Sequence, residues 1–209
     1  MKIRLVWILP VLLAGLIVWG CSPKSRYERS LNRGLASGVR HDTLFMGIYF
    51  GMSDKDFYSH CWMLNREGLI KQGTSNMSVE RALKEELAHP ATMNFYPEFG
   101  EGKIVEMTVR FIYNGWAPWN EELSSESLQQ DVLSWYKKIY GNGFITVEHS
   151  SRGQAHIRID GNRRITIFKD GDDMHVWAVF TDMLALKDPN KSGSDAVDLY
   201  EEITKDLVK

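Results

Sequence analysis

Two tryptophans and two glutamates stand close together in the segment GWAPWNEE, as Trp116, Trp119, Glu121 and Glu122. Exposed indole rings can stack on sugar rings or anchor a protein interface, and paired carboxylates serve as acid and base in glycoside hydrolysis. Pro118 restricts the loop and would hold the indoles in a fixed arrangement. In the plainer alternative, the indoles cover the apolar end of the next helix and the glutamates complement its dipole. We expect one tryptophan to pack and the other to be partly exposed.

Other residue types that support catalysis lack the spacing that catalysis requires. The sequence has no HExxH pattern, GxSxG turn or lysine-containing phosphate loop. Cys61 falls on the apolar stripe of a predicted helix, where cysteine is usually a small core residue. If the apolar residues of the C-terminal strands share one face, the opposite face carries a row of Thr146, His156, Phe168 and His175. Its histidines would lie about 10 Å apart, too far to share one zinc ion. We therefore expect no catalytic residue, metal site or cofactor.

The first 21 residues have the pattern of an export signal. Lys2 and Arg4 precede an uncharged run from Leu5 to Gly20, which is shorter than the roughly 20 residues of a spanning helix. The motif VWGC resembles the lipobox of bacterial lipoproteins, in which the cysteine is acylated with fatty acids such as palmitate. This resemblance implies a signal peptide over residues 1–20, lipidation of Cys21 and a location in the cell envelope, with the domain outside the cytoplasm. An uncleaved signal anchor is the alternative.

Charge is distributed unevenly after Cys21. Residues 22–40 have a net charge of +4 and residues 41–209 a net charge of −8. The basic segment, residues 21–41, is expected to be a tether that suits anionic lipid headgroups or is simply solvated. The acidic remainder argues against nucleic acid as a partner. With Cys21 lipidated, Cys61 would be the only thiol, so no internal disulfide is expected. The charged residues of the tether are Lys24, Arg26, Glu28, Arg29, Arg33 and Arg40.

Two predicted helices begin and end with the same signals. Ser53 and Ser124 are expected N-caps, while Gly68 and Gly141 follow the last turns. Each helix precedes residues with strand character, which indicates a duplicated unit of a helix followed by a sheet. The apolar stripes are Phe57, Cys61 and Leu64 in the first helix and Leu128, Val132, Trp135 and Ile139 in the second.

Period-two alternation dominates the region after Gly143. The runs FITVEH, QAHIRID, RRITIFK and MHVWAVF are separated by turn compositions and predict a four-stranded antiparallel meander. An earlier hairpin is predicted from MNFYPEF and KIVEMTVRFIY. The segment SVERALKEELAHP is ambiguous, because Val79, Leu83 and Leu87 fit a helix ended by Pro90, whereas a strand would complete the repeat. We favour a helix for residues 78–89.

These elements predict an α+β fold, an antiparallel sheet of meander and hairpin with helices packed on one face. Residues 42–186 would form a single domain. Residues 187–209 would form a linker and a C-terminal amphipathic helix, whose apolar stripe is Ala196, Leu199, Ile203 and Leu207.

A second resemblance concerns the entry to the first helix. GIYFGMSDKDFYSHCWML is similar to the glycine-methionine-serine/threonine entry in the small outer-membrane-assembly lipoproteins of the BamE/SmpA group, which also begin with a lipobox. Together these features predict a noncatalytic, membrane-anchored envelope lipoprotein that acts as a binding or assembly module for another envelope protein. The alternative is a glycan-binding or glycan-processing envelope protein that uses Trp116, Trp119 and the nearby carboxylates Glu121 and Glu122.

Overall fold

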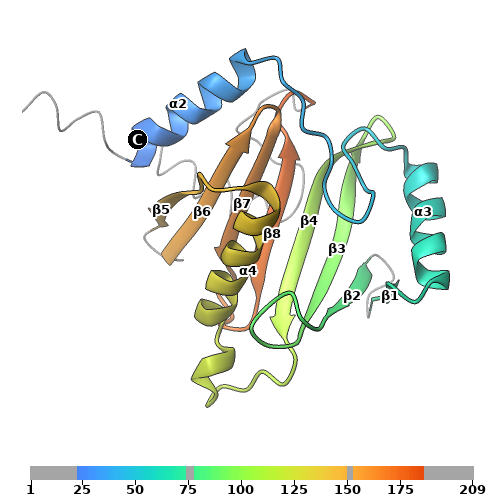
Figure 1. The fold of residues 1–209 in the computed structure, drawn as a ribbon, viewed down its shortest axis with the longest axis vertical. Coiled ribbons are helices and arrows are strands. Elements are labelled where there is room, and N and C mark those ends of the chain that lie inside the picture. The colour runs from blue at the N-terminus through green and yellow to red at the C-terminus, as the bar shows by residue number, and fades with distance from the viewer. Residues whose placement is uncertain (1–22, 74–77, 150–152, 186–209) are drawn as a thin grey trace, which may run out of the picture.

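The computed structural model describes residues 23–73, 78–149 and 153–185, which form an α+β fold around one eight-stranded antiparallel sheet (Figure 1). The helices are α2 (Pro23–Ala36), α3 (Asp54–Arg66) and α4 (Ser125–Tyr140), with a 3₁₀ turn at Glu121–Leu123. The strands are β1 (Lys71–Gln72), β2 (Val79–Leu83), β3 (Ala91–Gly100), β4 (Lys103–Tyr113), β5 (Ile145–His149), β6 (Gly153–Asp160), β7 (Arg163–Lys169) and β8 (Val176–Asp182). Within these ranges, no helix is both long and apolar enough to cross a bilayer.

The sheet contains the same unit twice. Its strand order is β1-β2-β3-β4-β8-β7-β6-β5, so α3 followed by β1 to β4 forms one half and α4 followed by β5 to β8 forms the other. The halves join through antiparallel pairing of β4 with β8 at the centre. The predicted antiparallel α+β fold, with its hairpin and its meander, is confirmed, and the two units form one continuous sheet.

Local capping signals place the two long helices where the sequence predicts them. The Ser53 side chain accepts a hydrogen bond from Asp56 N, and the Ser124 side chain accepts one from Ser127 N. Gly141 ends α4 with a φ of 88°, a backbone conformation that favours glycine. The large core contains residues of both helices and of the sheet face that they cover.

The helix predicted for residues 78–89 is wrong. Val79–Leu83 form strand β2, which pairs with β3, and residues 84–89 form a series of bends. The Glu86 carboxylate accepts hydrogen bonds from the backbone N–H groups of Lys84 and Glu85 and from Arg81, which stabilises a turn in place of a helix. Pairing with the edge of β3 therefore overrides the local helical propensity.

The predicted histidine row is also wrong, because the strands are offset by one residue from the expected register. The two-residue connection between β6 and β7 pairs Asp160 with Arg163, which places His156 opposite Ile167. Phe168 consequently points to the other face of the sheet, where it joins a second core cluster. Both faces of the sheet are buried here. The alternation of apolar residues alone therefore does not show which side chains of a strand belong to which of the two cores.

Helix α2 replaces the first part of the expected tether. Tyr27 and Leu31 are buried in the second core cluster, together with residues of β5 to β8. This cluster lies on the sheet face opposite α4, so the helices do not all pack on one face. The expected linker over residues 21–41 is corrected from Pro23 onward, and the folded domain begins before residue 42. The predicted signal peptide, Cys21 and the C-terminal segment 187–209 lie outside the described residues.

Candidate functional site

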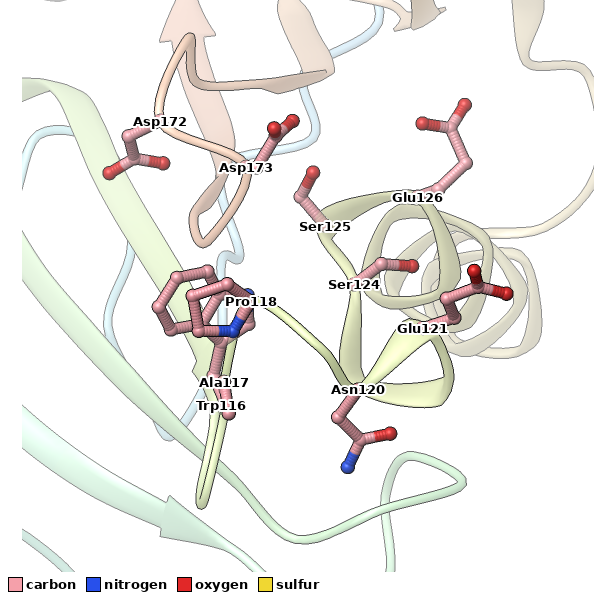
Figure 2. A pocket seen from close by; sticks show the side chains of 10 residues that line it. All are labelled: Trp116, Ala117, Pro118, Asn120, Glu121, Ser124, Ser125, Glu126, Asp172 and Asp173. Carbon is pink, nitrogen blue, oxygen red and sulfur yellow. The ribbon is translucent and has the colours of Figure 1, made fainter.

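The tryptophan segment borders a cleft at the start of α4 (Figure 2). The cleft has a volume of about 410 Å³ and is formed by the loop after β4, the first turn of α4 and the turn between β7 and β8. In Figure 2 the rings of Trp116 and Pro118 overlap in the view, with Asp172 and Asp173 above them and the first turn of α4 to the right. Its lining residues are Trp116, Ala117, Pro118, Asn120, Glu121, Ser124, Ser125, Glu126, Asp172 and Asp173.

The structure separates the four residues that the sequence grouped. Trp116 is half-buried and lines the cleft with Glu121, whereas Trp119 is 85% exposed and does not line it. Glu122 is exposed and also lies outside the lining. A single indole and a single glutamate of the predicted set therefore meet at one site.

The cleft gains acidic groups from the β7–β8 turn, which sequence reasoning missed. Asp172 accepts hydrogen bonds from the backbone N–H groups of Met174 and His175, and its carboxylate also pairs with the His175 ring. Partial burial opposes ionisation, but these hydrogen bonds prevail and lower the pKa of Asp172 below its usual value. This wall of the cleft is therefore a carboxylate at neutral pH.

Among the described residues, the turn also contains a group of side chains spaced closely enough to hold a metal ion. One ligand atom each from Asp170, Asp172 and His175 lie within 4.8 Å of one another. Trp177 Nε1 donates a hydrogen bond to Asp170 Oδ2 at 2.9 Å, and Asp172 is held by the turn. The internal contacts of the turn account for this arrangement without a ligand.

Two side chains with catalytic chemistry lie in settings that suppress it. Burial lowers the pKa of His156, with Lys137 adding to the effect, and the ring contacts Thr146 Oγ1 at 3.0 Å. The imidazole is therefore neutral near pH 7. Burial raises the pKa of the Cys61 thiol to about 11, which leaves little of the nucleophilic thiolate at neutral pH.

A second candidate site lies along α3 and was missed by sequence reasoning. Tyr58 and Trp62, four residues apart on one helical face, are 52% and 63% exposed. They border a groove of about 370 Å³, here called the α3 groove, between α3 and the β1–β2 edge of the sheet. It is lined by Phe57, Tyr58, Cys61, Trp62, Asn65, Ile70, Lys71, Gln72, Ser78, Val79 and Tyr96.

Contacts within the α3 groove fix its aromatic rim. The hydroxyls of Tyr58 and Tyr96 form a hydrogen bond of 2.7 Å, which with burial raises the pKa of Tyr96 to about 12. The Arg66 guanidinium lies over the Trp62 ring, 5.1 Å from its centroid. The sequence does contain the signal for this surface, since Tyr58 and Trp62 lie off the apolar stripe that contains Phe57.

No family model, curated protein or solved structure matches the chain.

Proposed function

We propose that the chain is a noncatalytic lipoprotein of the cell envelope, anchored through Cys21, that binds a partner protein with the α3 groove. The observation that carries this proposal is the exposed aromatic face of Tyr58 and Trp62 beside an apolar groove. Tyrosine, tryptophan and arginine are the residue types most enriched at the energetic centres of protein interfaces, and Arg66 stacks on Trp62.

The repeated unit gives an internal comparison for this face. When α3 and α4 are aligned on their capping serines, Tyr58 corresponds to Gln129 and Trp62 to Leu133. Gln129 and Leu133 are buried, because α4 lies across the central strands β4, β7 and β8. In α3 the same helical face is left open at the edge of the sheet and carries larger aromatic side chains. It therefore has the composition of a surface that another polypeptide covers.

The groove also indicates what its partner presents. Phe57, Ile70 and Val79 form an apolar lining that an aliphatic or aromatic side chain can fill. At the rim, Arg66 can donate hydrogen bonds to a carboxylate while it stacks on Trp62. The expected partner is thus an envelope protein segment with an apolar anchor residue next to an acidic one.

Cross-linking in cells tests the proposal with a matched pair of tryptophans. The full-length protein carries either Trp62→Ala or Trp119→Ala, both at exposed positions where truncation changes folding stability little. We expect one envelope protein to be captured by the wild type and by Trp119→Ala. Capture by Trp62→Ala should fall about thirtyfold, which corresponds to a hot spot of about 2 kcal/mol. Capture that depends on Trp119 and not on Trp62, or no captured protein, would refute this assignment.

The anchor is tested separately by Cys21→Ala. If Cys21 is lipidated, this variant should leave the membrane fraction when the signal peptide is removed. Retention of the variant with its signal segment uncleaved would favour a signal anchor over a lipid anchor.

Glycan binding is a second candidate, favoured by the half-buried Trp116 in a polar cleft beside Glu121. One indole face and several carboxylates can stack on a sugar ring and accept hydrogen bonds from its hydroxyls. Since Trp119 and Glu122 lie outside the cleft, the version with two parallel indoles has no support. A glycan array probed with the full chain and with Trp116→Ala tests it, and binding unaffected by Trp116→Ala would exclude the cleft.

A further inference from the structure

We propose that the outward face of α2 is a membrane-surface contact that binds anionic lipid headgroups and sets the orientation of the domain on the bilayer. The inference rests on the proposed anchoring through Cys21, and it adds a second contact of defined geometry. A lipid anchor alone leaves the domain free to change its orientation on the membrane. A charged face on a helix that is packed firmly on the sheet would fix that orientation when it binds lipid.

The outward face of α2 is a basic stripe. Arg26, Arg29 and Arg33 are exposed and, at 100° per residue, fall within an arc of about 60°. Tyr27 and Leu31, which face the sheet, lie on the other side of the helix. The three guanidinium groups therefore point away from the protein together, where they can reach lipid phosphates.

Helix α2 is docked closely enough to transmit this orientation to the sheet. A Cβ on Gly34 would lie 2.8 Å from both Gly161 O and Ile159 Cγ2, so the helix backbone packs directly on the β6–β7 turn. Tyr27 and Leu31 fill the core beneath the helix. This close packing leaves α2 no room to rotate about its own axis.

The chain leaving α2 is held by a polar network at the same turn. His41 N donates a hydrogen bond to Asn162 Oδ1 at 2.6 Å, and Asn162 Nδ2 donates to Asp182 Oδ1 at 3.0 Å. Arg40 bridges Asp42 and Asp182 with contacts of 2.8 and 2.9 Å. Both the helix and its exit are thus fixed to the β6–β7 turn and the end of β8.

The position of α2 in the chain places the stripe at the bilayer surface. Pro23 follows Cys21 by two residues, which span at most about 7 Å. Acyl chains on Cys21 would therefore hold the first turn of α2 within a Debye length of the headgroups, where basic residues are attracted to anionic lipids.

This orientation points the α3 groove away from the membrane. Helix α2 packs on β5 and β6, whereas α3 lies near β1 and β2 at the other end of the sheet (Figure 1). The α3 groove is at that second end. Five inter-strand spacings separate β2 from β6, a distance of about 24 Å along the sheet. The two surfaces also lie on opposite faces, so a protein can reach the groove while the stripe is on lipid.

Spin labels on the full-length protein test the inference. The protein is purified from membranes and reconstituted into vesicles of phosphatidylcholine alone or with phosphatidylserine. In a Cys61→Ser background, a nitroxide is placed at Ala36→Cys, beside the stripe, or at Glu67→Cys, after α3. With phosphatidylserine, we expect collisions of a water-soluble nickel chelate with the label at position 36 to fall about tenfold, and those at position 67 to stay unchanged.

Two variants that lose the same positive charge distinguish an effect of the α2 stripe from an effect of net charge. Replacing the three stripe arginines by glutamine should abolish the protection at position 36, as should high salt. Replacing three exposed lysines outside α2 by glutamine, as in the control variant named below, should leave the protection at position 36 intact. Equal accessibility in both lipids, or protection that survives loss of the stripe, would overturn the inference. Labelling of Cys21 itself would instead show that lipidation, and so the proposed anchor, is absent. The control triple is Lys55→Gln, Lys137→Gln and Lys138→Gln.

Discussion

Replacing Gly161 by alanine measures how tightly the chain after α2 packs on the β6–β7 turn. Gly161 has a φ of +58°, a left-handed conformation that side chains disfavour. A Cβ there would also lie 2.3 Å from Val39 O and 3.2 Å from His41 Cδ2. Because the nearest atom belongs to the backbone, it cannot rotate away, and the segment at Val39 must shift. The substitution therefore combines two independent penalties.

The two penalties can be separated with a second glycine. Left-handed backbone costs a non-glycine residue about 1–2 kcal/mol, and overpacking costs typically about 1–3 kcal/mol. For Gly161→Ala the sum is about 3 kcal/mol. Gly102, in the β3–β4 turn, has a φ of +73° but nothing within 4 Å of its Cβ position, so Gly102→Ala should cost only about 1 kcal/mol. The difference of about 2 kcal/mol measures the contact of Gly161 with Val39, in the chain that follows α2.

Thermal unfolding of the full chain in detergent, followed by tryptophan fluorescence, gives the comparison. At about 2–4 °C per kcal/mol for a chain of this size, Tm should fall by about 6–12 °C for Gly161→Ala and by about 2–4 °C for Gly102→Ala. Equal shifts for the two variants would refute the close packing of Val39 on the turn. They would also remove one of the contacts that hold the exit of α2 on this turn.

Three further predictions concern buried or half-buried side chains. Because the folded chain holds the pKa of His156 below 6.5, the unfolded chain gains the proton first, so stability should fall as pH drops below about 6.5. His156→Gln should flatten this part of a pH series of urea titrations, and an unchanged slope would exclude His156 as its source. Ile157→Asp buries an unpaired charge and should abolish the near-ultraviolet circular dichroism of the fold; a wild-type spectrum and Tm would contradict its burial. Cys61, with a pKa of about 11, should react with iodoacetamide more than about tenfold more slowly in the folded chain than in urea, and equal rates would contradict its protection.

Local signals in the sequence predicted the elements that depend on local chemistry. The serine caps and terminal glycines located α3 and α4, since those groups satisfy backbone N–H and C=O groups within one turn. The alternation of apolar and polar residues predicted the strands of the meander, because successive side chains of a strand point to opposite faces of the sheet. The pairing of Asp160 with Arg163 was not predicted, because both faces of this part of the sheet are buried and two registers fit the same apolar pattern.

Elements that depend on distant contacts could not be predicted in this way. Residues 79–83 form a strand only because β3 offers an edge with which to pair. In the basic segment, just Tyr27 and Leu31 supply the deeply buried apolar face of α2, and their partners come from strands more than 100 residues later. The acidic wall of the cleft likewise comes from Asp172 and Asp173, which reach Trp116 only through the order of strands in the sheet.

The duplicated architecture explains why the candidate surfaces lie at the two ends of the sheet. The central strands β4 and β8 are covered by α4, whose aromatic side chains Tyr136 and Tyr140 are buried in the large core. At the outer ends the two halves differ: α2 covers β5 and β6, while the opposite end is bordered by α3 with Trp62 exposed. Under the two proposals, the basic helix next to the proposed anchor would face lipid, and the aromatic groove at the far edge would face a protein partner. If both assignments hold, disrupting one should leave the other intact, because the rigid sheet between them separates the two contacts.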